Sequence, residues 1–390
     1  MTILIAVISV ILFLLIIVIH ELGHFFAAKA CDVKVNEFAI GMGPKILKYQ
    51  GKETLYTLKL FPIGGACYME GEDSPSGQVD EEEASDTPKE AEKKAKAEET
   101  TGPKYLEVFP RAFCNKKIWQ RAIILAAGAV LNILLGFVLM GVVTAQEKEA
   151  YTSTIIAGFG KGAVSNAEGG LQVGDKIIAV NGYSVYCAQD LGMSLQMDAG
   201  KPMDFKVVRD GKKLNLKQLS FKTEQTPKWG KVTIVDFYVE GIPKTFGSFI
   251  SQTFNNTISY TRSVYETLFR LITGRLSATS VSGPVGIAEG MTQATSQSYQ
   301  AGMSEGGFGK AFANSMNTVL NILAIITVNL GVMNLLPIPA LDGGRLLFLI
   351  IEGIRCKPIK NEGMIHFIGF ALLMVLILLV TFKDIIHLFK

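Results

Sequence analysis

Long apolar runs alternate with polar and strand-like stretches along this chain. Four of the runs reach the roughly 20 residues that a helix needs to cross a bilayer. They occupy residues 1–30, 118–145, 311–341 and 364–383. A cleaved signal peptide is the alternative for the first run, but that run lacks a basic n-region and exceeds the usual h-region length. The pattern therefore predicts a polytopic α-helical membrane protein with about four transmembrane helices.

Two stretches carry the pattern of β structure. Alternation at Leu55, Thr57 and Lys59 indicates a strand within residues 31–70. In residues 151–225, Asn181-Gly182 and Asp210-Gly211 are typical of two-residue hairpin turns. We therefore expect a small sheet in the first stretch and a β-rich domain in the second.

Two other segments have distinctive compositions. Residues 71–104 hold runs of Glu and Lys among Ala, Ser, Thr and Pro, which cannot bury a core. They predict a disordered charged insertion, either a solvated spacer or a tail that binds a partner. In residues 245–300, apolar residues recur at roughly helical spacing, which indicates an amphipathic, peripheral segment. It either lies on the membrane surface or packs against the bundle.

Composition agrees with a mixed chain. The 390 residues are 49% hydrophobic and 19% charged, with a mean hydropathy of +0.32. That is too apolar for an ordinary soluble globule and too polar for membrane helices alone. The net charge of +3 is small and spread out, which argues against nucleic-acid binding. The five cysteines lack CxxC spacing, which argues against a disulfide framework or a second zinc site.

Basic residues predict the orientation in the membrane. They flank the start of the second run and fill the loop between the third and fourth: Lys116, Lys117, Arg121, Arg345, Arg355, Lys357 and Lys360. The positive-inside rule then places loops 31–117 and 342–363 in the cytoplasm. Both termini and the β-rich domain lie outside.

The first apolar run ends in the string His20-Glu21-Leu22-Gly23-His24. Histidines at i and i+4 project from one face of a helix, where they can bind one Zn²⁺. Glu21 can then act on a water in the remaining coordination site. The string therefore predicts a zinc peptidase centre inside a membrane helix.

A catalytic zinc usually has a third protein ligand. Asp342 is the best candidate, because an acidic residue at the edge of an apolar span marks a function by default. The alternative is a helix-ending turn whose aspartate caps the next helix. His366 and His387 stand in or after the last run without a companion motif, and we interpret them as interfacial or packed.

The HExxH string followed by the distal Asn334-to-Gly343 segment, NxxPxPxLDG, resembles the site-2 protease family of intramembrane zinc metalloproteases, in its bacterial RseP-like branch. The resemblance implies that His20, His24 and Asp342 are the zinc ligands and that Glu21 is the general base. It also implies that Asn334 and Pro337 engage the substrate backbone near the metal.

Two shorter segments extend the resemblance. Residues 40–44 are similar to the GxGP segment of the family, and residues 60–66 are similar to its PxGG turn, which contains Gly64 and Gly65. In the family these segments form a membrane-associated sheet able to pair with an extended substrate. A cytoplasmic hairpin without catalytic relevance is the alternative. Residues 282–286, Ser-Gly-Pro-Val-Gly, also match a family segment without assigned chemistry.

Residues 169–182 resemble the core motif of PDZ domains, which bind a peptide as an added strand. The domain would bind a peptide ligand or act as a size filter outside the membrane. The resemblance implies regulated intramembrane proteolysis in a bacterial plasma membrane. The expected substrates are single-span membrane proteins, such as an anti-sigma factor or a signal-peptide remnant. A catalytically silent membrane scaffold that uses its PDZ-like domain is the alternative.

Overall fold

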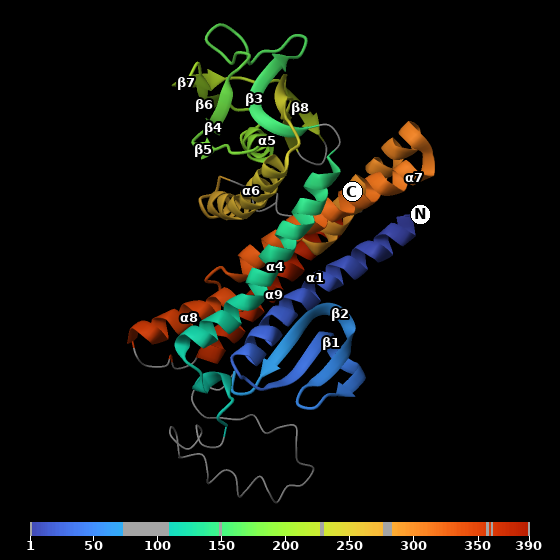
Figure 1. Ribbon diagram of the computed structural model, residues 1–390, viewed down its shortest axis with the longest axis vertical. Helices are drawn as coiled ribbons and strands as arrows, with labels where there is room; N and C mark the ends of the chain where they lie inside the picture. Colours follow the sequence, from blue (N-terminus) through green and yellow to red (C-terminus); the bar gives the residue numbers. More distant parts are fainter. Residues whose placement is uncertain are drawn as a thin grey trace, which may run out of the picture. The chain divides into compact units, whose positions relative to one another are not determined.

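The computed structural model describes residues 2–72, 109–147, 150–226, 230–275, 283–355, 359 and 362–388. The expected charged insertion at 71–104 lies outside these residues, except for its first two positions. The chain divides into two compact units, one of Met1–Gly136 with Leu268–Lys390 and one of Phe137–Thr267. Figure 1 shows their helices and strands in sequence colours.

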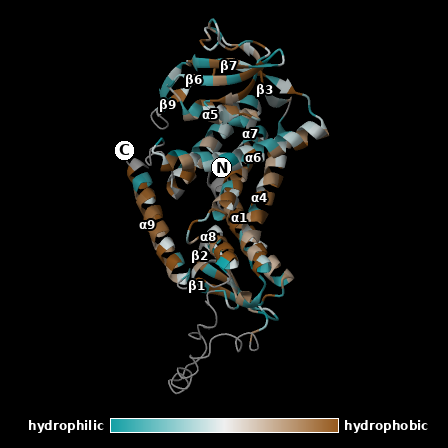
Figure 2. Cartoon of the chain, turned by 90° about the vertical axis from the view of Figure 1, so that its left-hand side faces the viewer, coloured by the Kyte–Doolittle hydropathy of each residue, from teal (hydrophilic) through white to brown (hydrophobic). Residues whose placement is uncertain are grey.

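The first unit contains the apolar helices and the small sheet. Its elements are α1 (Thr2–Ala30), β1 (Val35–Gln50), β2 (Leu55–Met69), the short 3-10 helix η1 (Phe113–Asn115), most of α4 (Ile118–Gln146), α7 (Pro284–Asn334), α8 (Asp342–Arg355) and α9 (Glu362–Leu388). Among the described residues, four helices are long and apolar enough to cross a membrane: α1, α4, α7 and α9. Figure 2 shows apolar colouring along α1, α4 and α9. The prediction of about four long apolar helices is confirmed.

The third apolar helix differs from its prediction. We expected a span over 311–341 and a peripheral segment up to residue 300. Instead α7 begins at Pro284, reverses at Gly306 and Gly307, and ends at Asn334. Gly307 has a φ of 75°, a left-handed conformation that glycine adopts without steric cost.

The two arms of α7 form a helical hairpin. The Ser298 and Thr318 hydroxyls lie 2.6 Å apart across the arms. Met291 of the first arm packs with Ile16 of α1 and Leu323 of the second arm. Residues 284–300 are therefore part of the bundle. The predicted end of the span at residue 341 is wrong, because the helix ends at Asn334, before the turn that contains the prolines.

Strands β1 and β2 form the sheet expected in residues 31–70. Ile40 of β1 pairs with Gly65 on one side and with Leu58 on the other, so that β2 bends around β1. Val35 and Phe38 pack with Ala28 of α1 and Ile124 of α4, which fixes the sheet to the helix that carries the histidines.

The second unit contains a β-rich domain. Its strands are β3 (Tyr151–Phe159), β4 (Lys176–Val180), β5 (Tyr183–Ser184), β6 (Met203–Arg209), β7 (Lys212–Leu219), β8 (Thr223–Thr226), β9 (Gly230–Thr233) and β10 (Phe237–Ile242), with helix α5 (Ala188–Met197). The main sheet has the order β10-β3-β4-β6-β7, and β5 pairs with β4. The predicted hairpins are confirmed, since Asn181 and Asp210 both take positive φ in the turns β4–β5 and β6–β7.

The predicted end of this domain at residue 225 is wrong. Strand β10 pairs with β3 along the sheet edge. Phe237 of β10 also belongs to the buried core with Ile156 and Phe205. The sequence between β7 and β10 is polar, so its pattern did not show that the chain returns to the sheet.

Helix α6 (Phe246–Ile272) buries its polar side and exposes its apolar side. Ser259 donates to the Asp190 carboxylate at 2.7 Å, and Arg262 binds the same carboxylate at 3.3 Å. Burial and the nearby Asp190 charge raise the pKa of Tyr183 to about 12, which keeps its hydroxyl protonated toward Asp190. Phe246, Ile250, Phe254, Phe269 and Ile272 remain exposed.

A buried ion pair supports the β-rich domain, and its loss is a testable prediction. Arg209 binds Asp175 through Nε and Nη2 at 2.7 and 2.8 Å, and Asp175 has no exposed surface. Arg209→Met leaves this carboxylate buried without its cation, which should destabilise the domain by about 3–5 kcal/mol. Hydrogen exchange of β4 and β6 in the detergent-solubilised full chain should accelerate accordingly.

Lys213→Met is the matched control, because Lys213 is exposed on β7 and its loss should leave exchange unchanged. Unaltered protection of β4 and β6 in the Arg209 variant would contradict a stabilising role for the pair.

Candidate metal centre

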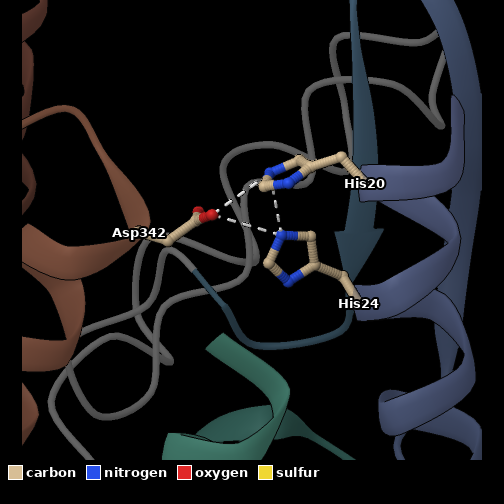
Figure 3. Close-up of side chains that lie close together, drawn as sticks. All are labelled: His20, His24 and Asp342. Atoms are coloured by element: carbon tan, nitrogen blue, oxygen red, sulfur yellow. Dashed lines mark hydrogen bonds and ion pairs between the residues drawn. The ribbon is translucent and has the colours of Figure 1, made fainter. Parts of the chain in front are cut away.

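The two motif histidines lie on one face of α1 and point at the same position (Figure 3). Their Nε2 atoms are 3.3 Å apart, and both rings are buried. The helical spacing produces this arrangement directly, since i and i+4 side chains stack on one face.

Asp342 reaches the same position from the other end of the chain. Its Oδ2 lies 3.2 Å from Nε2 of His20 and 3.3 Å from Nε2 of His24. Asp342 is also the first residue of α8, but the first turn of that helix bonds back to the Leu341 carbonyl, so Asp342 does not occupy the N-cap position that the alternative requires. The prolines of the preceding turn end α7 and redirect the chain so that α8 begins at the histidines.

Hydrogen bonds to the outer ring nitrogens orient both imidazoles. His24 Nδ1 donates to the Ile124 carbonyl at 2.9 Å, which leaves the lone pair of Nε2 facing the site. His20 Nδ1 lies 3.3 Å from the Asn132 amide nitrogen, while the buried amide oxygen of Asn132 has no hydrogen-bond partner among the described residues. A half-turn of that amide lets its oxygen accept from His20 Nδ1, and we expect metal binding at Nε2 to select this rotamer.

Two glycines bring α4 against the histidines. A Cβ on Gly128 would lie 2.3 Å from Nε2 of His24 and 2.9 Å from Cε1 of His20. A Cβ on Gly23, within the motif, would lie 2.6 Å from the Ala127 carbonyl oxygen. The backbones of α1 and α4 therefore approach each other as closely as glycine permits, and the space beside the ligand nitrogens depends on Gly128.

The site fits a zinc ion. Tetrahedral zinc with ligands at about 2.0–2.1 Å separates each ligand pair by roughly 3.3–3.4 Å. The three ligand atoms here are 3.2, 3.3 and 3.3 Å apart. The Asp342 Oδ2 atom is buried without a hydrogen-bond partner in the described part of the chain, and two imidazoles with one carboxylate form a catalytic zinc donor set.

Glu21 lies between the metal ligands and the sheet. Its carboxylate lies within electrostatic range of His24, His20 and Asp342, and the Cys67 backbone forms a hydrogen bond with it. A Cβ on Gly65 would lie 2.7 Å from Cγ of Glu21, so β2 packs directly against this side chain. The sheet thus fixes the position of Glu21 beside the candidate metal site.

The structure brings some of the other candidate residues to the site. The Asn334 amide nitrogen is 3.2 Å from Nε2 of His20. Gly65 reaches Glu21, while its neighbour Gly64 faces the Met42 side chain. Pro337 is exposed in the turn between α7 and α8.

Sequence reasoning missed Gly128 and Asn132. Both stand in an apolar helix, where an asparagine is costly unless it has a partner and small residues permit close packing. The sequence Ala-Ala-Gly-Ala at 126–129, followed by Asn132, therefore held a usable signal.

Comparisons with known proteins cover nearly the whole chain. The profile described as peptidase family M50 matches residues 8–376, which includes both motifs. The zinc metalloprotease RasP of Geobacillus kaustophilus is 32% identical over 428 aligned residues, covering 96% of this chain and 96% of that protein. The regulator of sigma-W protease RasP of Bacillus subtilis is 30% identical over 446 aligned residues, covering 97% of this chain and 98% of that protein.

Proposed function

The chain belongs to peptidase family M50 and is a zinc metalloprotease of the site-2 type, and we propose that His20, His24 and Asp342 are its zinc ligands. The observation that carries this proposal is the triangle of ligand atoms, whose three edges of 3.2–3.3 Å match a tetrahedral zinc. The hydrogen bond from His24 to Ile124 supports it, because metal-bound histidines donate their other N–H in this way.

Glu21 acts as the general base. A zinc ion held by His20, His24 and Asp342 would supply Lewis-acid chemistry, activating a water and polarising a peptide carbonyl. The Glu21 carboxylate takes a proton from that water at one of its Oε atoms while the water oxygen attacks the carbonyl carbon. Protonated Glu21 then gives the proton to the nitrogen of the leaving amine, and the peptide C–N bond breaks. Asn334 Nδ2, close to His20 Nε2, donates a hydrogen bond to the substrate backbone.

The substrate binds as an extended segment beside β2. Peptide bonds within a helix are closed to attack, so the substrate span unwinds near the site. Gly65 and Cys67 of β2 already contact Glu21. A strand added along Gly64 and Gly65 would be held by main-chain hydrogen bonds next to the base.

The protein is a multi-pass membrane protein, and its substrates are single-span membrane proteins. The B. subtilis relative is named for regulation of sigma-W, which supports an anti-sigma factor as one substrate class. A signal-peptide remnant is a second. The positive charges described above place loops 31–117 and 342–363 in the cytoplasm and both termini outside the plasma membrane.

The β-rich domain of the second unit, formed by strands β3 to β10, is a PDZ-like domain outside the membrane. Its β10 lies at the edge of the sheet, where a peptide can add as a further strand. The exposed apolar side of α6 rests on the outer surface of the bilayer. The domain selects substrates by peptide binding or by size before they reach the zinc.

Removing the metal should abolish cleavage. We expect treatment of the purified protein with 1,10-phenanthroline to stop cleavage of a single-span substrate. Added zinc should restore it, with product masses that place the cut within the span. The isomer 1,7-phenanthroline, which does not chelate, is the control. Full activity after verified zinc removal would refute the proposed mechanism, and zinc binding without cleavage of any span would favour the silent scaffold.

A further inference from the structure

The turn that carries Asp342 holds a conformation that its own sequence does not favour. Ala340, two residues before Asp342, has a φ of 84°. A residue with a Cβ persists in the left-handed region only where its surroundings hold it there. Some contact outside the turn must therefore fix this backbone, and with it the direction in which Asp342 points.

Helix α9 supplies that contact through His366. The main-chain N–H of Ala340 donates to Nδ1 of His366 at 3.1 Å. Two other side chains contact the His366 ring. The Phe348 ring of α8 packs edge-on against it with the ring centroids 5.2 Å apart, and Oε1 of Glu362 lies 3.8 Å from its Nε2 atom. An Nδ1 that accepts a hydrogen bond carries no proton, so the ring is the neutral tautomer with its proton on Nε2.

Helix α9 contacts the segment before Asp342 a second time at Gly369, about one helical turn after His366. A Cβ on Gly369 would lie 2.4 Å from Cβ of Pro339 and 2.9 Å from the Pro339 carbonyl oxygen. Because Gly369 has no Cβ, the helix can pack directly against Pro339, the residue before Ala340. Between this contact and Asp384, which binds the start of α7, helix α9 is largely exposed, as at Leu372 and Leu376. His366 and Gly369 are therefore the residues of α9 that pack against the turn.

We propose that His366 is a positioning residue of the metal centre, which holds Ala340 in its left-handed conformation so that Asp342 reaches the two histidines. It touches neither metal nor substrate. This inference rests on the proposed zinc site and adds a residue from the last helix to it. The required property is an acceptor atom at the Nδ1 position, because the partly buried main-chain N–H of Ala340 needs a partner.

Substitutions can separate the acceptor from the volume of the ring. His366→Phe keeps the ring against Phe348 but removes the acceptor. His366→Asn places its amide oxygen where Nδ1 stands, and His366→Gln extends its acceptor toward the Nε2 position. We measure zinc affinity of the full-length protein in detergent by competition with a chromophoric chelator, and the visible spectrum after Co²⁺ substitution.

We expect His366→Phe and His366→Gln to bind zinc about 10- to 100-fold more weakly than wild type, with an altered Co²⁺ spectrum. His366→Asn should retain near-wild-type affinity and spectrum. Wild-type zinc affinity in the Phe variant would overturn the inference. Equal losses in the Phe and Asn variants would also overturn it, because volume rather than the acceptor would then decide.

Substitutions at two glycines of α9 test the positioning role if His366→Phe does not fold. Gly369→Ala inserts a Cβ into Pro339, whereas a Cβ on Gly363 meets nothing within 4 Å. Weaker zinc binding in Gly369→Ala alone supports the inference, and unchanged binding in both variants refutes it. The proposed function is tested separately by His24→Ala. If His24→Ala binds zinc like wild type, the proposed zinc site is wrong. If His24→Ala loses zinc while His366→Phe binds zinc like wild type, only the positioning role of His366 is wrong.

Discussion

Replacement of Glu21 by glutamine is expected to slow cleavage by about 10²- to 10⁴-fold, the usual contribution of a general base. Glutamine keeps the size of the side chain, and its oxygen can still accept the hydrogen bond from the Cys67 backbone. It cannot take a proton from water. Since Glu21 is not one of the three clustered ligands, zinc content should remain that of wild type. Single-turnover cleavage of a purified single-span substrate, with zinc quantified in each sample, measures both quantities.

Glu224→Gln serves as the control, because Glu224 is exposed on β8 of the other unit and should leave both quantities unchanged. Unimpaired turnover of Glu21→Gln at equal zinc would assign the base to another group. Loss of zinc together with activity would instead mean that Glu21 supports the ligand geometry.

The proximity of the two candidate ligand histidines could be predicted because their geometry is local. A helix fixes the directions of His20 and His24 from sequence spacing alone, and the structure places their Nε2 atoms 3.3 Å apart. Asp342 needed more than spacing. Its approach depends on where α7 ends and how the proline turn is held, and the sequence indicated only an acidic residue at the edge of an apolar run, together with the order of the two motifs.

The parts that sequence reasoning missed depend on contacts between distant segments. Gly128 matters because α1 and α4 meet at that residue, which no periodicity in α4 reveals. The reversal of α7 at Gly306 and Gly307 packs the arm that begins at Pro284 against the bundle, one of the two alternatives that the sequence left open. Strand β10 joins the sheet through pairing with β3, about eighty residues earlier, and a strand of six residues does not indicate so distant a partner.

Replacement of Gly128 by alanine is expected to weaken zinc binding about 100-fold or more, at or beyond the upper end of effects outside the ligand set. The new Cβ would lie 2.3 Å from the His24 Nε2 atom that faces the metal. The ring cannot move aside without losing its 2.9 Å hydrogen bond to Ile124. Helix α4 cannot retreat freely either, since its Ile124 and Leu125 are buried in one core with Ala28 of α1. Zinc affinity and the Co²⁺ spectrum report the effect independently of activity.

Gly141→Ala is the matched control, because it makes the same change on the same helix without the steric clash. It shows whether α4 responds to any glycine-to-alanine substitution. Its Cβ would meet Phe249 and Thr253 at 3.6 Å, an ordinary contact distance. Because alanine is the better helix former, we expect Gly141→Ala to fold and to bind zinc like wild type. If Gly128→Ala also bound zinc with wild-type affinity, the space beside His24 would not be required for the metal. The ion would then have to bind on the other side of the two imidazoles, away from α4. Such a result would remove Gly128 from the site while leaving the three ligands in place.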